Sequence, residues 1–426
     1  MKTRPVGPVS LLALGVNGIV GVGIFFVPAD LARRAPGSGS VLVFAATALA
    51  LLPVAVCFAV LGRRYHTDGG PVVYARAAFG ELASFLVGWV TYVSAVASAA
   101  AVTAGLTGAV LPDAGTSLRG LAAATLASVL ALVAASGIVI SARAWTTLTA
   151  IKLLPLAALG ALALGLLSTA GPPAPAAAAA SPSWLAAGLL AMFALQGFEI
   201  VPVIAGHVRS PERSIPLATV GAVVAAAALY VVLQAACVRA LPELARSSAP
   251  LADLAGVLGG ARFARVVAAG TTLSALGIAF AMMVTTPRYL SALAEGGRLA
   301  FGLESMSPRG VPARALLVTW AAVALLLQSR DRAELFALSS VAVLVQYGVT
   351  AAALAVLARR GERGLSARHA VLAAPALAVA FALGAGATRR EAVVTAGAVV
   401  LGLALRSISS RGRRTPSAAP ERTGPP

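Results

Sequence analysis

The stretch Gly18-Ile19-Val20-Gly21-Val22-Gly23-Ile24-Phe25, with Pro28 just beyond it, lies within the first long apolar segment of the chain. Glycine and proline are poor helix formers: relative to Ala, an interior Gly costs about 1 kcal/mol and an interior Pro about 3 kcal/mol. In lipid, non-helical backbone is tolerated only where protein buries it or where it lines a cavity. The stretch therefore predicts a first helix that unwinds midway and turns bare amide groups toward a bound molecule. The alternative interpretation is a glycine-rich face for close helix packing.

The composition is that of a polytopic helical membrane protein. Of the 426 residues, 59% are hydrophobic and 11% are charged, and the mean hydropathy is +0.90. Apolar runs recur along the chain, each long enough to cross a hydrocarbon core of roughly 30 Å. The short alternating strands of an outer-membrane barrel are missing from the sequence. The basic start of the chain has no small-residue cleavage site, so we expect no removable signal peptide.

Twelve segments are predicted to span the membrane. They are residues 9–32, 40–62, 83–111, 119–141, 144–168, 183–206, 215–240, 264–290, 311–328, 334–358, 368–386 and 390–408. A loop rich in Pro and Ala occupies residues 171–182, and we expect the tail at 411–426 to be disordered.

The net charge of +18 is dispersed between the apolar spans rather than gathered in a basic domain, which argues against nucleic-acid binding. Positive loops orient spans and attract anionic lipid head groups. More of the Lys and Arg residues fall inside than outside if both termini are cytoplasmic. We therefore predict a multi-pass protein of the inner or plasma membrane with both termini in the cytoplasm.

A second glycine-centred break follows in the sixth span, in Gln196-Gly197-Phe198-Glu199-Ile200-Val201-Pro202. The first and sixth spans each open a set of five, and an odd number of spans makes the two sets opposite in topology. Broken helices at matching positions of inverted repeats are typical of secondary transporters, which bind substrate at the breaks.

Four stretches carry a family resemblance. They are Gly21-Val22-Gly23-Ile24-Phe25; the loop from Gly69-Gly70-Pro71 to Phe79-Gly80; the sixth span with its exit, Arg209-Ser210-Pro211-Glu212; and Pro287-Arg288-Tyr289 with the following loop. Together they resemble the amino acid–polyamine–organocation superfamily of permeases and antiporters. One departure concerns the substrate: some relatives have Ser at the position of Val22, where its hydroxyl helps to hold a carboxylate.

The resemblance implies an all-α integral membrane fold of the leucine-transporter type. Residues 1–170 would form the first five-helix repeat and residues 183–360 the second, inverted repeat, separated by an extracellular loop at 171–182. Residues 361–410 would add helices 11 and 12, before a cytoplasmic tail at 411–426. Helices 1 and 6 would both be broken.

The predicted substrate site combines the two breaks with aromatic side chains. Amide groups of an unwound helix suit a carboxylate, and carbonyl groups suit an ammonium. The resemblance aligns Phe193 with an aromatic gate over the substrate, while ordinary packing is the alternative. The predicted substrate-binding residues are Ile19, Gly21, Val22, Gly23, Tyr92, Phe193, Gly197, Glu199 and Phe280.

Two ionisable residues within spans are candidates for proton coupling. A charge inside the membrane is costly, so Glu199 is a functional candidate by default; the alternative is an acceptor that pins the helix-six break. Lys152 is one of only two lysines in an arginine-rich chain. Lys can lose its proton when desolvated, whereas Arg cannot. In proton-coupled relatives a Lys on span five resembles Lys152 and takes the place of a sodium ion; snorkelling to the interface is the alternative.

These observations predict a secondary transporter that moves an amino acid or related amine by alternating access, as a uniporter, proton symporter or exchanger. A polyamine or amine antiporter and a non-transporting sensor of the same fold are alternatives. An integral-membrane lipid enzyme is less favoured, because the clustered Asp, His or Glu residues of such an enzyme are missing from the sequence. Cys57 and Cys237 are interpreted as small apolar residues. No metal-ligand spacing, Walker loop or catalytic motif is present, so we expect no metal, no cofactor and no enzyme activity. The sequence leaves oligomer formation open.

Overall fold

The computed structural model describes residues 6–21, 23–137, 142–169, 183–295, 299, 301–328, 332–362 and 364–411, with the backbone alone for 142–152, 332 and 410–411. The described chain is helical, with one isolated bridge between Val6 and Val208. The helices are α1 Pro8–Ile19, α2 Gly23–Arg34, α3 Ser38–Gly62, α4 Pro71–Phe79, α5 Glu81–Val110, α6 Thr116–Ala135, α7 Ala142–Ser168, α8 Trp184–Leu195, η1 Phe198–His207, α9 Pro211–Ala240, η2 Leu244–Arg246, α10 Pro250–Ala294, α11 Ala313–Leu326, α12 Arg332–Arg359, α13 Ala367–Gly384 and α14 Arg389–Arg411.

The predicted all-α membrane fold is confirmed. Nine helices of the described chain are long and apolar enough to cross a membrane, and the bent pair α1 and α2 makes a tenth. The other two predicted spans correspond to shorter apolar helices, Leu153–Ser168 within α7 and Ala313–Leu326. The total of twelve crossings therefore stays a prediction.

Helical segments lie in two stretches that the sequence predicted as loops: α4 in one, and η2 with the start of α10 in the other. Gly70 has a φ of 49°, which turns the chain, and Pro71 then occupies the first turn of α4, where a missing N–H costs nothing. The first ten residues of α10 precede a kink at Gly260, whose φ is 76°. The predicted loops 171–182 and 411–426 lie outside the described residues, apart from the last residue of α14.

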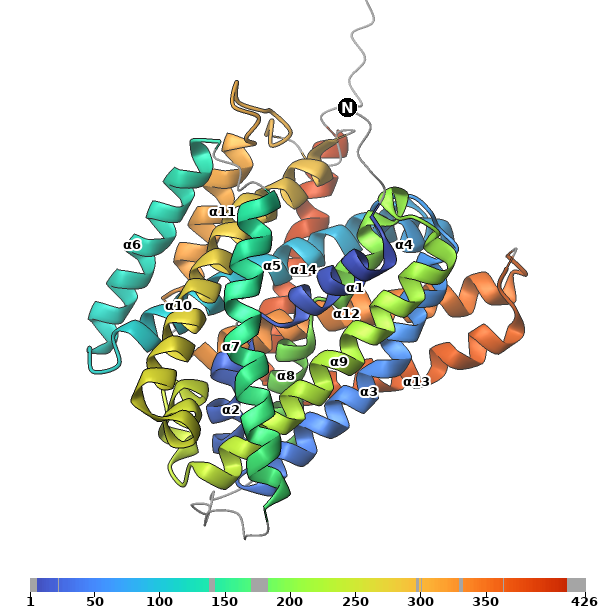
Figure 1. The fold of residues 1–426 in the computed structure, drawn as a ribbon. Helices are drawn as coiled ribbons and strands as arrows, with labels where there is room; N and C mark the ends of the chain where they lie inside the picture. Colours follow the sequence, from blue (N-terminus) through green and yellow to red (C-terminus); the bar gives the residue numbers. More distant parts are fainter. Residues whose placement is uncertain are drawn as a thin grey trace, which may run out of the picture.

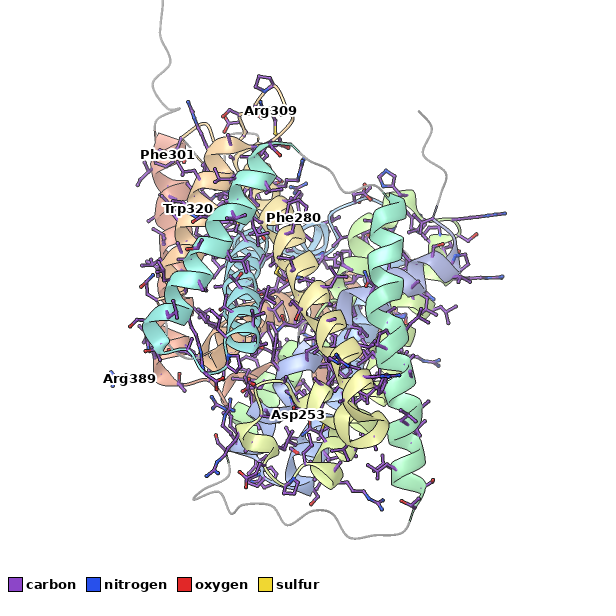
Figure 2. The ribbon with its side chains drawn as sticks, turned by 60° about the vertical axis from the view of Figure 1, so that its left-hand side comes forward. Asp253, Phe280, Phe301, Arg309, Trp320 and Arg389 are labelled. Atoms are coloured by element: carbon purple, nitrogen blue, oxygen red, sulfur yellow. The ribbon has the colours of Figure 1, made fainter. Side chains whose placement is uncertain are left out.

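The helices form one bundle around a continuous apolar core. In Figure 1, α6 lies at one edge and α13 at the opposite edge, with α5 and α12 running through the middle. Figure 2 places Arg309 at one end of the bundle and Asp253 and Arg389 toward the other end. A chain that crosses the bundle repeatedly has the loops between its helices at alternate ends, as these three residues are.

Candidate substrate site

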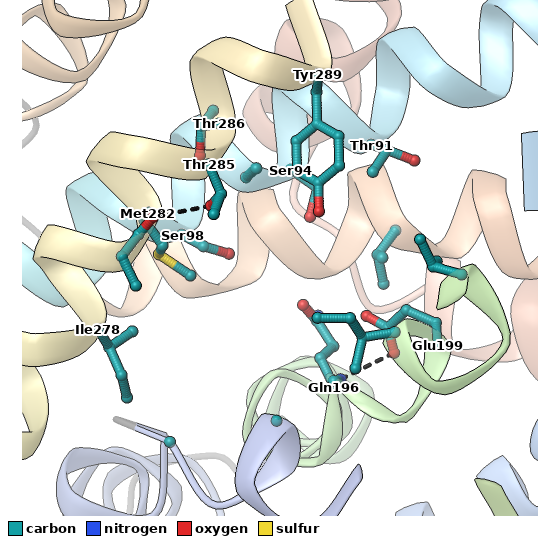
Figure 3. A pocket seen from close by; sticks show the side chains of 18 of the residues that line it. Thr91, Ser94, Ser98, Gln196, Glu199, Ile278, Met282, Thr285, Thr286 and Tyr289 are labelled. Carbon is teal, nitrogen blue, oxygen red and sulfur yellow. Dashed lines mark hydrogen bonds between the residues drawn. The ribbon is translucent and has the colours of Figure 1, made fainter. Parts of the chain in front are cut away.

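A cavity of about 750 Å³ lies between the two helix breaks and the helices α5, α10 and α12. Figure 3 shows its polar side chains: α10 contributes Tyr289, α5 contributes Thr91, and the second break contributes Gln196 and Glu199. The volume falls within the range of small-molecule sites, which is about 300–1,000 Å³.

The first break separates α1 from α2, whose axes differ by 42°. The Gly21 N–H turns back to the Ile19 carbonyl at 2.6 Å instead of continuing the helix. The Tyr230 hydroxyl of α9 donates to the same carbonyl at 2.9 Å and so ties the break to the bundle. Val22 lies outside the described residues.

The second break separates α8 from the 3-10 helix η1. Gly197 has a φ of 122°, a conformation that L side chains rarely adopt, which explains why glycine stands there. Its N–H donates to Glu199 Oε2 at 2.8 Å, and the Tyr347 hydroxyl of α12 donates to the same oxygen at 3.1 Å. Glu199 therefore pins the break, as the structural alternative for this residue predicted, and its part in substrate or proton binding stays a prediction.

The glycines of the breaks serve two different purposes. A side chain at Gly197 would collide with the backbone carbonyl of Gly18, and a Cβ at Gly23 would lie 2.5 Å from Ala194 Cα on α8. These glycines allow close helix packing. A Cβ at Gly21 would meet only ordinary contacts, the nearest being Ile278 Cδ1 at 3.5 Å across the cavity. The packing interpretation thus holds at Gly23 and Gly197, and Gly21 faces the cavity, while contact of this stretch with a bound molecule stays a prediction.

Most of the predicted substrate-binding residues line the cavity: Ile19, Gly21, Gly23, Phe193, Gly197, Glu199 and Phe280. Tyr92 is not among the lining residues; it is 5% exposed, and its hydroxyl lies 3.3 Å from Thr319 Oγ1 on α11. Position around the helix decides this: Thr91 and Ser94 face the cavity from α5, whereas Tyr92, between them, points to another side of the same helix. The Lys152 side chain lies outside the part of the chain that the structure describes.

Phe193 closes one side of the cavity. Its ring stacks on Phe336 of α12, with centroids 4.2 Å apart and an interplanar angle of 29°. The geometry suits both a gate and ordinary packing, since aromatic stacking stabilises either arrangement.

A polar cluster that was not predicted from the sequence joins the second break, α5 and α12. Ser98 and Ser94 contact Ser339 Oγ at 2.7 and 3.1 Å, and the Gln196 amide donates to Ser340 Oγ at 3.1 Å. Nearer the other end of the same two helices, the Thr91 hydroxyl of α5 donates to Gln346 Oε1 of α12 at 3.2 Å. The spacing of Ser94 and Ser98 on one helix face was a signal that could have been read.

A comparison with family models now decides the classification. The model described as Amino acid permease matches residues 6–396. The chain belongs to this amino acid permease family. The predicted membership of the wider amino acid–polyamine–organocation superfamily is thereby confirmed.

One curated relative of the permease is an uncharacterized transporter of Mycobacterium tuberculosis. The two sequences are 32% identical over an alignment 441 residues long, which covers 99% of this chain and 96% of that protein. Cationic amino acid transporter 4 of Homo sapiens is 27% identical, over 83% of this chain and 60% of that protein. A vacuolar cationic amino acid transporter 4 of Arabidopsis thaliana is 24% identical, over 84% of this chain and 63% of that protein. The permease is therefore a transporter by family.

The cavity of the permease carries little charge. Among the described lining residues, Glu199 is the only one with an ionisable acidic or basic side chain apart from the phenol of Tyr289. Serine, threonine and amide groups supply the remaining polar side chains of the lining. Such a site can hold the polar groups of a small molecule through backbone groups and hydroxyls while apolar walls exclude water.

Proposed function

We propose that this permease is a secondary transporter that moves an amino acid or a related amine across the membrane by alternating access. The observation that carries the proposal is the cavity, which brings both helix breaks together at one site. The relatives named as cationic amino acid transporters support an amino acid or amine as substrate.

The proposed binding mode uses backbone groups first. Amides of the first turn of α2, just after the first break, would hold the substrate carboxylate, because the first N–H groups of a helix have no intrahelical acceptor. Carbonyl groups at the breaks and the Glu199 carboxylate would attract the ammonium. With Val22 in place of a hydroxyl-bearing residue, the carboxylate would depend on backbone amides at that position.

The cycle would run as uniport, proton symport or exchange, and Lys152 on α7 and Glu199 are the residues proposed to carry a proton. The permease would lie in the inner or plasma membrane with both termini in the cytoplasm. The two five-helix sets, 1–170 and 183–360, would be the inverted repeats that supply the two breaks.

Reconstitution tests this function directly. Purified protein in liposomes is screened with radiolabelled amino acids and polyamines, with and without internal substrate and with an imposed proton gradient. We expect saturable uptake of at least one amino acid or amine. Uptake only against internal substrate would identify an exchanger, and gradient-driven uptake a proton symporter. Saturable binding without flux would contradict transport and favour a sensor.

A pair of variants tests the site. Phe193→Leu removes the stack against Phe336 at the cavity, whereas Phe85→Leu removes a stack against Trp89 whose centroids are 6.4 Å apart and which does not line the cavity. We expect Phe193→Leu to raise the KM for uptake roughly 2- to 10-fold, in line with the strength of an aromatic pair. Phe85→Leu should lower thermal stability and leave KM unchanged. Equal KM values in the two variants would remove Phe193 from the site.

A further inference from the structure

The turn between α3 and α4 holds the end of the 3-10 helix η1. Asp68 makes the contact with both carboxylate oxygens: Oδ1 accepts the Gly206 N–H at 3.0 Å, and Oδ2 lies 3.0 Å from His207 Nδ1. The next residue adds a backbone bond, because the Gly69 N–H donates to the Val203 carbonyl at 2.9 Å. Three contacts thus fasten η1 to a single turn.

The same end of η1 is held from the other side by the start of the chain. The Val6 N–H donates to the His207 carbonyl at 2.8 Å, and the Arg209 N–H donates to the Val6 carbonyl at 2.9 Å. The end of η1 is therefore clasped between the N-terminal segment and the turn that carries Asp68.

The clasp lies at one end of the substrate cavity. Gly69 and Val72 of the turn and α4, and Val203 of η1, line the cavity together with Tyr289 and Leu293 of α10. The Phe193–Phe336 stack lies at the other end: Phe336 is near the start of α12, whereas Arg360, just after its last residue, donates to the Ala78 carbonyl of α4 at 3.0 Å. In this conformation the cavity extends to the α4 end, and Phe193 of the stack lines it toward the opposite end.

We propose that Asp68 is a positioning residue for transport: by binding Gly206 and His207 it holds η1 against the turn and stabilises the conformation in which the cavity reaches the α4 face. This inference rests on the proposed alternating access. When the cavity closes at this face, η1 moves toward α10 and the contacts of Asp68 with Gly206 and His207 separate. Asp68 touches no substrate and acts through η1.

The contact with His207 is an ion pair when the imidazole is protonated, so Asp68 then offers a charge as well as a hydrogen-bond acceptor. His66 lies on the same turn as Asp68, and its Nε2 contacts the Arg63 carbonyl at 2.8 Å. His66 therefore serves as the histidine control for His207.

The test measures which face the cavity opens to, without any substrate. A cysteine is introduced as Gly277→Cys, because Gly277 lines the cavity and a Cβ there meets nothing within 4 Å. The two native cysteines, which are buried, are replaced by Ala. A membrane-impermeant thiol reagent is applied to vesicles of both orientations. We expect Asp68→Ala to slow labelling from the α4 face about 2- to 5-fold, as loss of a partly exposed ion pair and one hydrogen bond would, and to speed labelling from the opposite face.

Four further variants test the clasp. Asp68→Asn keeps an acceptor for Gly206 and should fold even if Asp68→Ala does not, and it should slow labelling from the α4 face because the charge that faces His207 is lost. His207→Gln should also slow labelling from the α4 face, while His66→Gln should leave it unchanged. Glu362→Ala is the matched control, because it breaks an ion pair with Arg64 at 3.0 Å in the same connection without touching η1.

Wild-type labelling from both faces in Asp68→Ala, or in Asp68→Asn where the alanine variant does not fold, would overturn the inference. An equal change in Glu362→Ala would also overturn it, because general loosening of the loop would then explain the effect. Failure of the proposed function is recognised separately, as altered labelling in a protein that takes up no amino acid or amine.

Discussion

At the scale of single residues, Gly21 and Gly23 lie on either side of the first break and would meet different neighbours if they carried side chains. A Cβ at Gly23 would press on the backbone of α8 at Ala194, and backbone cannot rotate away. A Cβ at Gly21 would project into the cavity beside Ile278. Gly21 is thus exposed to the cavity, whereas Gly23 is needed for close packing against α8.

This difference predicts two phenotypes. Gly23→Ala should lower the free energy of unfolding by about 1–3 kcal/mol, the usual cost of overpacking. Gly21→Ala should leave the melting temperature near that of the wild type and weaken substrate uptake. Thermal unfolding in detergent and uptake into vesicles measure the two effects. A Gly23→Ala protein as stable as the wild type would contradict the packing role, and unchanged uptake in Gly21→Ala would remove that residue from the site.

At the scale of one element, the start of the 3-10 helix η1 is held by the carboxylate of Glu199, which accepts the N–H of the residue before the helix. Glu199 accepts the Gly197 N–H and the Tyr347 hydroxyl on one oxygen, so its loss would leave a half-buried and a buried donor without this acceptor. Glu199→Ala should therefore destabilise the protein by about 1.5–3 kcal/mol, the range for hydrogen bonds to a charged group. Glu199→Gln should retain most of this stability, since its amide oxygen still accepts.

The comparison of these variants also separates the two roles of Glu199. Melting temperatures report on the break, and the pH profile of uptake reports on proton binding. A Glu199→Gln protein that folds and keeps the wild-type pH profile would leave Glu199 with the structural role alone. Tyr347→Phe is the companion variant, because it removes one donor and leaves the carboxylate in place.

At the scale of the whole molecule, transport requires two conformations with different affinities for whatever drives the cycle. If Lys152 binds and releases a proton between spans one, five and eight, its charge would bias that equilibrium. Lys152→Ala should then flatten the pH dependence of transport and largely spare substrate binding. Lys152→Arg should hold the charged state, because a guanidinium does not deprotonate.

Uptake measured across pH, together with equilibrium binding, checks this coupling. A lysine that only snorkels to the interface predicts no change in the pH profile of either variant. Transport by Lys152→Ala with a wild-type pH profile, and with no sodium requirement in either protein, would show that Lys152 is structural.

The sequence by itself determined the class of protein and the places where two helices are interrupted. The length of the apolar runs determines that the chain is a helical membrane protein, and the glycines at 18–23 and 197 determine where two helices are interrupted, because helix propensity and backbone freedom are properties of the residues themselves. The family resemblance rests on these stretches together with the loop at 69–80 and the loop that follows Tyr289.

Only the tertiary structure decided which glycine packs and which faces the cavity, since this depends on the distance from Gly23 to α8 and from Gly21 to α10. It also turned Tyr92 toward α11, joined Ser94 and Ser98 to Ser339, and brought Asp68 against Gly206. Each of these contacts joins residues more than a hundred positions apart. Hydropathy and spacing describe neighbours along the chain, whereas a contact across a bundle is decided by how whole helices pack.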